Sequence, residues 1–250
     1  MMRTIFGNNS RKRHPSIEDL INIHNSGSEF THAYETLINN LNIINGSHPA
    51  QTLLVTSSQP LEGKTTVATN LAVAMMLAKK KTLIVDTDLR RPSLHDIFEI
   101  ENDVGFANIL LGTDTVKELI HSIPIFENFE EDSTSISVMP SGQANKNLFK
   151  QIDPEKIKTA LNKMKDMFDV IILDSSPVLA VTDSLLIAPL VQDVILVLNT
   201  GVVKEEDVVS AKNLILKAGG KITGVVMNNF NEKQHGAGIQ PYSRYYNYNR

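Results

Sequence analysis

The chain alternates between short apolar runs and longer segments in which apolar residues recur every three or four positions. The short runs are typical of buried strands, and they fall at residues 52–56, 82–85, 136–139, 170–173, 194–198 and 222–227. The periodic segments are typical of helices, and they fall at residues 65–78, 154–168, 184–190 and 205–218, with shorter helical pieces across 94–121. Strands and helices in alternation predict an α/β domain with a mostly parallel sheet flanked by helices.

The ends of the chain differ from this pattern. From residue 28 an apolar stripe predicts one more helix, which Asn45-Gly46 ends. Residues 1–27 and 229–250 are polar and have little periodicity. We therefore expect a flexible N-terminal arm over 1–27, a folded domain over 28–228 and a disordered tail over 229–250.

Composition narrows the class of protein. The 250 residues include no Cys, and their formal net charge is -4. Without Cys the chain forms no disulfide, thiolate metal site or Cys nucleophile. The acidic balance argues against a nucleic-acid partner. No apolar run reaches the length of about 18 residues that a membrane span needs, so we expect a cytoplasmic protein without a transmembrane helix.

The clearest chemical signal lies between the 52–56 strand and the helix after it. From residue 56 the chain reads Thr-Ser-Ser-Gln-Pro-Leu-Glu-Gly-Lys-Thr-Thr, and Gly-Lys-Thr after a strand and before a helix is typical of a P-loop. Free N–H groups at the start of a helix bind phosphates. We expect Gly63, Lys64, Thr65 and Thr66 to bind ATP, with the Thr65 hydroxyl on Mg²⁺. Ser58 stands where the first Gly of the pattern is usual, and a plain strand-to-helix turn is the alternative interpretation.

Acidic residues follow two of the predicted strands. Asp86 and Asp88 come after the 82–85 strand, and Asp174 comes after the 170–173 strand. Ligands of open α/β sheets bind at the carboxyl ends of strands, so we expect these carboxylates to converge on Lys64 and Thr65. Mg²⁺ prefers hard oxygen ligands, which makes Asp174 a candidate metal ligand. For any single Asp a helix cap or a turn is the alternative.

These motifs, in this order, resemble the P-loop tyrosine autokinases of bacterial capsule and exopolysaccharide assembly. The resemblance rests on the loop before Thr65, on Asp-Thr-Asp-Leu-Arg-Arg-Pro from Asp86, on the strand end at Asp174, and on four Tyr in the last nine residues. It covers roughly residues 28–250 and implies transfer of phosphate from ATP to protein tyrosine, starting with the chain's own tail. The expected phosphorylation sites are Tyr242, Tyr245, Tyr246 and Tyr248.

The resemblance also implies roles for individual residues. Lys64, Asp86, Asp88 and Asp174 would be catalytic, with Asp86 as the base that deprotonates the acceptor tyrosine. Thr65, Asp88 and Asp174 would hold Mg²⁺. Asn228 matches a position where relatives contact adenine, and a strand-end cap is an equally good interpretation of it.

Partners and location follow from the same resemblance. The family implies a homo-oligomer, a membrane-anchored activator of the polysaccharide co-polymerase type and a cognate tyrosine phosphatase, with the kinase held at the inner membrane face through its partner. In the family's ring-forming helix motif, Glu-x-x-Arg-x-x-Arg, this chain has His32, Glu35 and Ile38.

Two other functions compete with the kinase. One is a nucleotide-switch ATPase of the MinD/ParA type, and the other is an idle regulatory subunit. The first type carries a signature Lys five residues before the P-loop lysine, where this chain has Gln59. Such an ATPase also has no need of a tyrosine-rich tail, and both points favour the kinase.

Overall fold

The computed structural model describes residues 29–46, 50–112, 115–125, 135–143, 148 and 153–229. The expected N-terminal arm, and all of the expected tail after Asn229, lie outside the described residues. The four tail tyrosines are therefore not placed by the structure, and the domain boundaries stay predictions.

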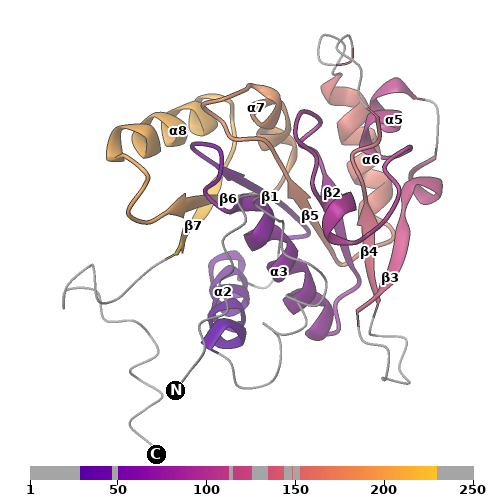
Figure 1. The fold of residues 1–250 in the computed structure, drawn as a ribbon, viewed down its shortest axis with the longest axis horizontal. Helices are drawn as coiled ribbons and strands as arrows, with labels where there is room; N and C mark the ends of the chain where they lie inside the picture. The colour runs from indigo at the N-terminus through magenta and orange to yellow at the C-terminus, as the bar shows by residue number, and fades with distance from the viewer. Residues whose placement is uncertain are drawn as a thin grey trace, which may run out of the picture.

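One sheet of seven strands organises the described chain (Figure 1). Its strands are β1 Thr52–Ser57, β2 Thr82–Asp86, β3 His121–Pro124, β4 Ser135–Met139, β5 Val170–Asp174, β6 Asp193–Asn199 and β7 Ile222–Asn228. They lie side by side in the order β3-β4-β2-β5-β1-β6-β7. All neighbours run parallel except β3, which pairs antiparallel with β4. The α/β class with a mostly parallel sheet is confirmed.

Helices cover both faces of the sheet (Figure 1). They are α2 Glu29–Asn45, α3 Lys64–Leu77, α4 Leu94–Ile97, α5 Phe106–Leu111, α6 Pro154–Lys165, α7 Asp183–Ile187 and α8 Glu205–Lys217, with the 3-10 helices η1 Val116–Leu119 and η4 Ala188–Leu190. Helices α2 and α3 lie on one face, while α6, α7 and α8 lie on the other. Within the described part of the chain, no helix has both the length and the hydrophobicity needed to cross a bilayer.

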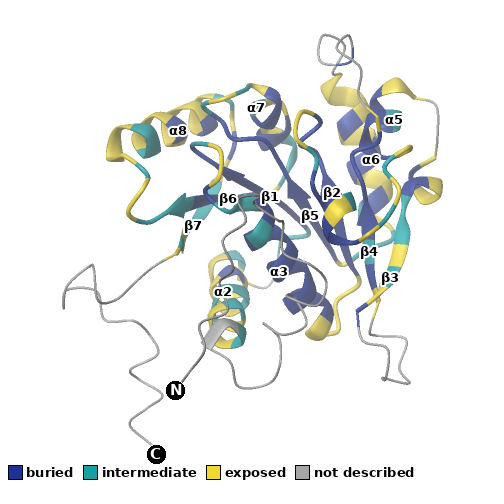
Figure 2. Ribbon diagram, in the orientation of Figure 1, coloured by how far each residue is buried: buried dark blue, intermediate teal, exposed yellow. Residues whose placement is uncertain are grey.

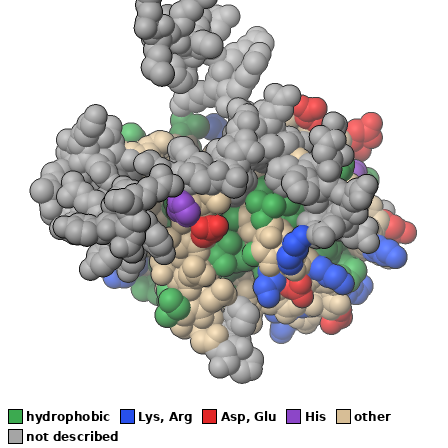
Figure 3. Space-filling view, turned by 90° about the horizontal axis from the view of Figure 1, so that it is seen from below, with side chains coloured by type: hydrophobic (Ala, Val, Ile, Leu, Met, Phe, Trp, Pro, Cys, Tyr) green, Lys and Arg blue, Asp and Glu red, His purple; other side chains and the backbone are tan. Residues whose placement is uncertain are grey.

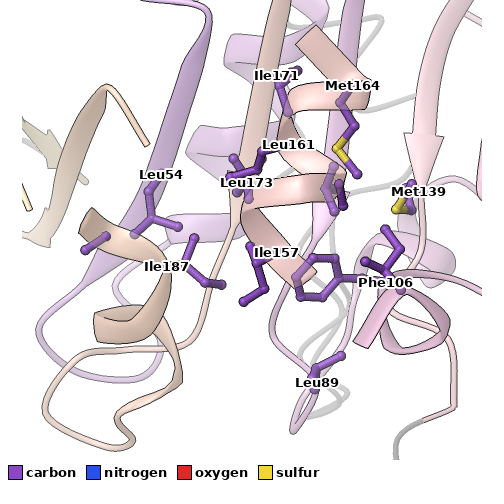
Figure 4. Close-up of a cluster of buried hydrophobic side chains, with 14 of the residues drawn as sticks. Leu54, Leu89, Phe106, Met139, Ile157, Leu161, Met164, Ile171, Leu173 and Ile187 are labelled. Carbon is purple, nitrogen blue, oxygen red and sulfur yellow. The ribbon is translucent and has the colours of Figure 1, made fainter. Parts of the chain in front are cut away.

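Two apolar clusters fill the space between the sheet and its helices. The first lies under α5, α6 and α7, where Phe106, Ile157 and Leu161 belong to the same cluster as Leu54 and Leu173 of the strands (Figure 4). The second lies between the sheet and α2 and α3. Strands β1, β2 and β5 are buried along their whole length (Figure 2). Because both faces of these strands are covered, their sequences are continuous apolar runs rather than alternating ones.

Six of the seven strands lie where the apolar runs predict them, and β3 does not. The expectation for residues 94–121 was short helical pieces, and α4, α5 and η1 fit it. The next four residues, His121–Pro124, form the edge strand β3 instead. Their burial alternates and they end in Pro, which a strand tolerates at a sheet edge. A segment so short carries too little pattern to reveal a strand, which forms here by pairing with β4.

Candidate active site

The loop between β1 and α3 is held in a conformation that requires glycine at its last position. Gly63 has φ +89°, and it is the N-cap residue directly before α3. A Cβ at this position would overlap the side-chain nitrogen of Asn228. Positive φ and close packing both exclude an ordinary side chain. The Gly of the predicted P-loop is thus needed for backbone geometry and for packing against β7.

Ser58 and Glu62 are joined by a hydrogen bond inside this loop. The Ser58 hydroxyl donates to the Glu62 carboxylate at 2.8 Å, and the Gln59 N–H donates to the same group at 2.8 Å. Ser58 is fully buried and Glu62 is 3% exposed. A Ser in place of the first Gly therefore has a structural role, since its hydroxyl anchors the loop to the Glu62 carboxylate. The sequence shows that Ser58 replaces the first Gly of the P-loop pattern, but it does not show that Glu62 is the hydrogen-bond partner of Ser58.

Asn228 lies at the end of β7 against the same loop. Its side-chain Nδ2 donates to the backbone carbonyl of Glu62 at 3.0 Å. Its backbone carbonyl accepts the Thr200 N–H at 3.0 Å. These bonds fit the strand-end interpretation of Asn228. Its contact with adenine stays a prediction.

The expected carboxylates meet at the ends of neighbouring strands. Asp86 ends β2 and Asp174 ends β5, and the strand register places the two residues directly opposite each other. Both are fully buried. Asp174 accepts a hydrogen bond from the Thr65 hydroxyl at 2.6 Å. The Lys64 Nζ lies 3.3 Å from Asp88 Oδ2 and 3.8 Å from Asp174 Oδ1. The tertiary structure thus brings Lys64, Thr65, Asp88 and Asp174 into one cluster.

The charges in this cluster shift one another's pKa values. Burial, which is the largest cause, and the facing carboxylate of Asp174 together raise the pKa of Asp86 to about 7, against the lowering effect of nearby N–H groups and Lys64. For Lys64, burial opposes the charged form, but Asp174, Asp88 and Asp86 together hold its pKa above the usual value. Lys64 is therefore a stable cation in the ligand-free site.

Asp86 and Asp88 have different surroundings although only one residue separates them. Asp86 accepts three backbone N–H groups, from Asp88 at 3.1 Å, Ser93 at 2.8 Å and Leu94 at 3.0 Å. Its carboxylate thus fixes the turn from β2 into α4. Asp88 instead faces Lys64 and lines the open pocket described next. Of the two, only Asp88 is placed where a bound substrate would touch it.

A pocket of about 620 Å³ opens beside this cluster. Three segments form its wall: the loop after β1, the loop after β2 and the loop after β5. The residues are Pro60, Leu61, Gly63, Lys64, Thr65, Thr66, Asp88, Arg90, Arg91, Pro92, Ser93, Ser176, Pro177, Ala180 and Val181. The sequence analysis missed the part formed by 90–93 and 176–181, although both segments directly follow strand-end Asp residues that it had selected.

The oxygen atoms of this cluster fit a magnesium ion. Thr65 supplies a hydroxyl, and Asp174 and Asp88 supply carboxylates, the hard ligands that Mg²⁺ prefers. The described residues contain no group of three or more His, Cys, Asp or Glu side chains that could hold a metal by themselves. Mg²⁺ usually keeps several waters and binds through one or two carboxylates plus substrate phosphates. The donor set suits a metal ion that binds together with a nucleotide.

Comparison with known proteins identifies the family. The AAA domain family matches residues 61–206, more than half of the chain. The chain is 30% identical over 201 residues to the Staphylococcus aureus protein CapB, which is named as a tyrosine-protein kinase, covering 80% of this chain and 85% of CapB. It is 27% identical over 202 residues to the Bacillus subtilis tyrosine-protein kinase YwqD, covering 81% of this chain and 82% of YwqD.

The solved structures agree with this assignment. The chimerical protein CapA2B2 has a TM-score of 0.76 and 29% identity, covering 87% of this chain and 92% of that chain. The Pyrococcus furiosus cell division ATPase MinD has a lower TM-score of 0.60 at 27% identity, covering 73% of each chain. The kinase is thus supported over the MinD-like alternative. Sequence and structure together show that the chain belongs to the bacterial tyrosine-protein kinases that include CapB and YwqD, within the P-loop AAA-domain fold.

Proposed function

We propose that this chain transfers the γ-phosphoryl group of ATP to tyrosine hydroxyls, first those of its own C-terminal segment. The observation that carries the proposal is the meeting of Lys64, Thr65, Asp88 and Asp174 at the edge of a pocket of about 620 Å³. The pocket has room beyond the P-loop for a second reactant. That space fits a kinase, which must hold an acceptor beside the nucleotide.

The P-loop side of the pocket binds the triphosphate. Backbone N–H groups from Gly63 to Thr66 surround the phosphates at the start of α3. Lys64 leaves its carboxylate partners and neutralises the β- and γ-phosphates. Thr65, Asp174 and Asp88 would hold Mg²⁺, which would supply charge neutralisation on the transferring group.

The acceptor reacts from the opposite side of the pocket. The phenol oxygen forms a bond to the γ-phosphorus while the bond to the β–γ bridging oxygen breaks, and ADP leaves. The phenol proton passes to a carboxylate, because tyrosine with a pKa near 10 is protonated at neutral pH. We assign this proton to Asp88, which lines the pocket. Asp86 is the base expected from the family resemblance. In this proposal its carboxylate instead positions Asp88, by accepting the Asp88 N–H within the turn that both residues share.

The acceptor side chains come from the four tyrosines near the end of the chain. Between residues 229 and 250 the charged side chains are Glu232, Lys233, Arg244 and Arg250, a net charge of +2. A second copy of the chain presents this segment to the pocket, in a homo-oligomer. The similarity to the chimera CapA2B2 supports a partner that activates the kinase and holds it at the membrane. A tyrosine phosphatase reverses the reaction, and the whole cycle regulates polymerisation and export of a capsule or exopolysaccharide.

The decisive experiment is mass spectrometry of the full chain after incubation with Mg-ATP and an activator fragment. We expect phosphate on tyrosines 242–248, and more than a hundredfold less in Lys64→Met, because the cation that neutralises the phosphates is gone. The Lys212→Met variant is the control, since Lys212 is an exposed lysine on α8 outside the pocket. Phosphate that persists in Lys64→Met, or ATP hydrolysis without any phosphotyrosine, would contradict the proposal.

A further inference from the structure

Two neighbouring arginines lie at the pocket, and among the residues that the structure describes only Arg90 has an anionic partner. Arg90 Nε donates to Asp183 Oδ2 at 2.8 Å, which joins the loop after β2 to the start of α7. The Arg91 guanidinium makes no ion pair or hydrogen bond with the residues that the structure describes. Arg91 is exposed and lines the same pocket. The pocket therefore carries an unpaired cation.

The backbone of Arg91 is fixed close to the reacting groups. Its N–H donates to Asp88 Oδ1 at 3.1 Å. The other carboxylate oxygen of Asp88 lies 3.3 Å from Lys64 Nζ. A single aspartate thus links the P-loop lysine to the segment that carries Arg91, and this bond keeps the backbone of Arg91 beside the P-loop.

The proposed acceptor segment offers no acidic side chain to this arginine. From Tyr242 to Arg250 the chain has two Arg and neither Asp nor Glu. Before reaction, the segment and the arginine therefore repel each other. One phosphotyrosine adds a charge of about -1.5 to -2 and three acceptor oxygens, the group that a guanidinium binds best.

We propose that Arg91 binds a phosphotyrosine that flanks the acceptor tyrosine, so that the first phosphorylation of the tail accelerates the following ones. The inference rests on the proposed function and adds the specificity of its acceptor site. Tyr245 and Tyr248 are three residues apart. Three residues of extended chain span about 10 Å, which lets one side chain enter the pocket while the other stays at its edge. Phosphorylation of the cluster then becomes progressive rather than random.

The test uses the full chain with its own tyrosines 242, 245, 246 and 248 changed to Phe, so that only an added peptide accepts phosphate. Two peptides of residues 239–250 keep Tyr245 as the acceptor, with Phe at 242 and 246. One has phosphotyrosine at 248 and the other has Phe there. We expect kcat/KM for the phosphorylated peptide to be about tenfold higher, since the hydrogen bonds of a guanidinium to a phosphate are charge-assisted and stronger than neutral ones.

Variants then assign this preference to Arg91. In Arg91→Gln the ratio of the two kcat/KM values falls to near one, and in Arg91→Lys part of it remains because the charge is kept without the bidentate geometry. Lys212→Gln makes the same charge change on α8 and keeps the full ratio. A wild-type ratio of one, or a ratio that survives in Arg91→Gln while both rates fall, would overturn the inference and leave the proposed function standing. Transfer to neither peptide would overturn the proposed function itself.

Discussion

At the scale of single residues, the P-loop shows how a motif residue depends on a distant neighbour. Gly63 is required by the loop motif, but the structure adds that the Asn228 side chain occupies the space where a Cβ would lie. The Asn228 side chain is held by the Glu62 carbonyl at 3.0 Å. Replacing Gly63 would therefore disturb the loop and the end of β7 together.

We predict that Gly63→Ala weakens ATP binding by about tenfold or more, because the alanine is strained at positive φ and collides with Asn228. The double variant Gly63→Ala with Asn228→Ala recovers part of the affinity, since only the collision is removed. Titration with a fluorescent ATP analogue measures both.

The matched control for this prediction is Gly201→Ala. Gly201 has φ +85°, but nothing lies within 4 Å of a Cβ built there. This variant carries the same backbone strain without a collision, and we expect it to bind ATP like the wild type. Equal binding by Gly63→Ala and wild type would show that the loop relaxes freely.

The residues at the site differ in how far the sequence reveals them. Gly63-Lys64-Thr65 is visible because its geometry is local, fixed by one loop and one helix start. The Glu62 carboxylate accepts hydrogen bonds from Ser58 and Gln59 within the loop. No sequence rule distinguishes such a Glu from one that is exposed to solvent. Arg91 could be recognised as unpaired only after the structure had shown that Asp183 engages Arg90.

At the scale of elements, α2 is attached to the sheet by a buried carboxylate. Asp193, the first residue of β6, is fully buried and accepts from Asn45 Nδ2 at 2.6 Å, from Lys221 Nζ at 2.9 Å and from the Thr223 hydroxyl. These bonds join the end of α2 to β6 and β7. They also hold the pKa of Asp193 below its usual value against the opposing effect of burial.

We predict that Asp193→Ala lowers the free energy of unfolding by about 2 kcal/mol, because three donors lose their common acceptor. Denaturant unfolding followed by circular dichroism measures the loss. Asp166→Ala is the control, since Asp166 is exposed and its carboxylate has no partner in the described chain. A loss below about 0.5 kcal/mol in Asp193→Ala would mean that water replaces these bonds without cost.

The helix that carries the expected ring motif differs from the family pattern. His32 Nδ1 and Glu35 Oε2 lie 3.1 Å apart, so these two motif positions pair within α2 itself. Both side chains are more than half exposed, and such a pair contributes little to stability. The family motif has arginines at the positions of Glu35 and Ile38. If copies of this chain assemble through α2, the contact must therefore use other side chains.

At the scale of the whole molecule, side chains of both charges lie on the face that Figure 3 shows. Seen from below in Figure 3, Lys and Arg side chains gather on one side of the face, with Asp and Glu among them. The formal net charge of the chain is -4. Inside the molecule, Asp86 faces Asp174 across two buried strand ends, and the pKa of Asp86 is raised there.

The burial of Asp86 and its repulsion by Asp174 make the stability of the ligand-free protein depend on pH. The pKa of Asp86 is raised to about 7 in the folded state from its usual 3.8. The folded protein therefore binds more protons than the unfolded chain between these values, and the free energy of unfolding falls as pH rises from about 4 to about 7. We predict that Asp86→Asn removes much of this fall, because the neutral amide does not ionise.

Denaturant unfolding of the ligand-free protein between pH 5 and pH 8 checks this prediction. Asp166→Asn is the control, since it removes a carboxylate from the surface and leaves the fall in place. The same slope in Asp86→Asn and in the wild type would contradict the assignment to Asp86. Because a bound Mg²⁺ would offset the repulsion between Asp86 and Asp174, we expect added Mg-ATP to flatten the wild-type profile as well.

The sequence by itself determined the elements and the central chemistry of this protein. Buried parallel strands can be recognised in the sequence as apolar runs. A P-loop is a local motif. An Asp that follows a parallel strand lies at the ligand-binding edge of the sheet in any strand order. Six strands and the grouping of Lys64, Thr65, Asp88 and Asp174 follow from these local rules.

Only the tertiary structure decided what depends on residues far apart in the chain. Strand order and register place Asp86 opposite Asp174, and pairing with β4 creates the edge strand β3. Packing of β7 sets Asn228 against Gly63, and a bond to α7 engages Arg90 while Arg91 stays unpaired. These contacts join residues tens to hundreds of positions apart. Their energy comes from the folded arrangement, and no local pattern in the sequence records it.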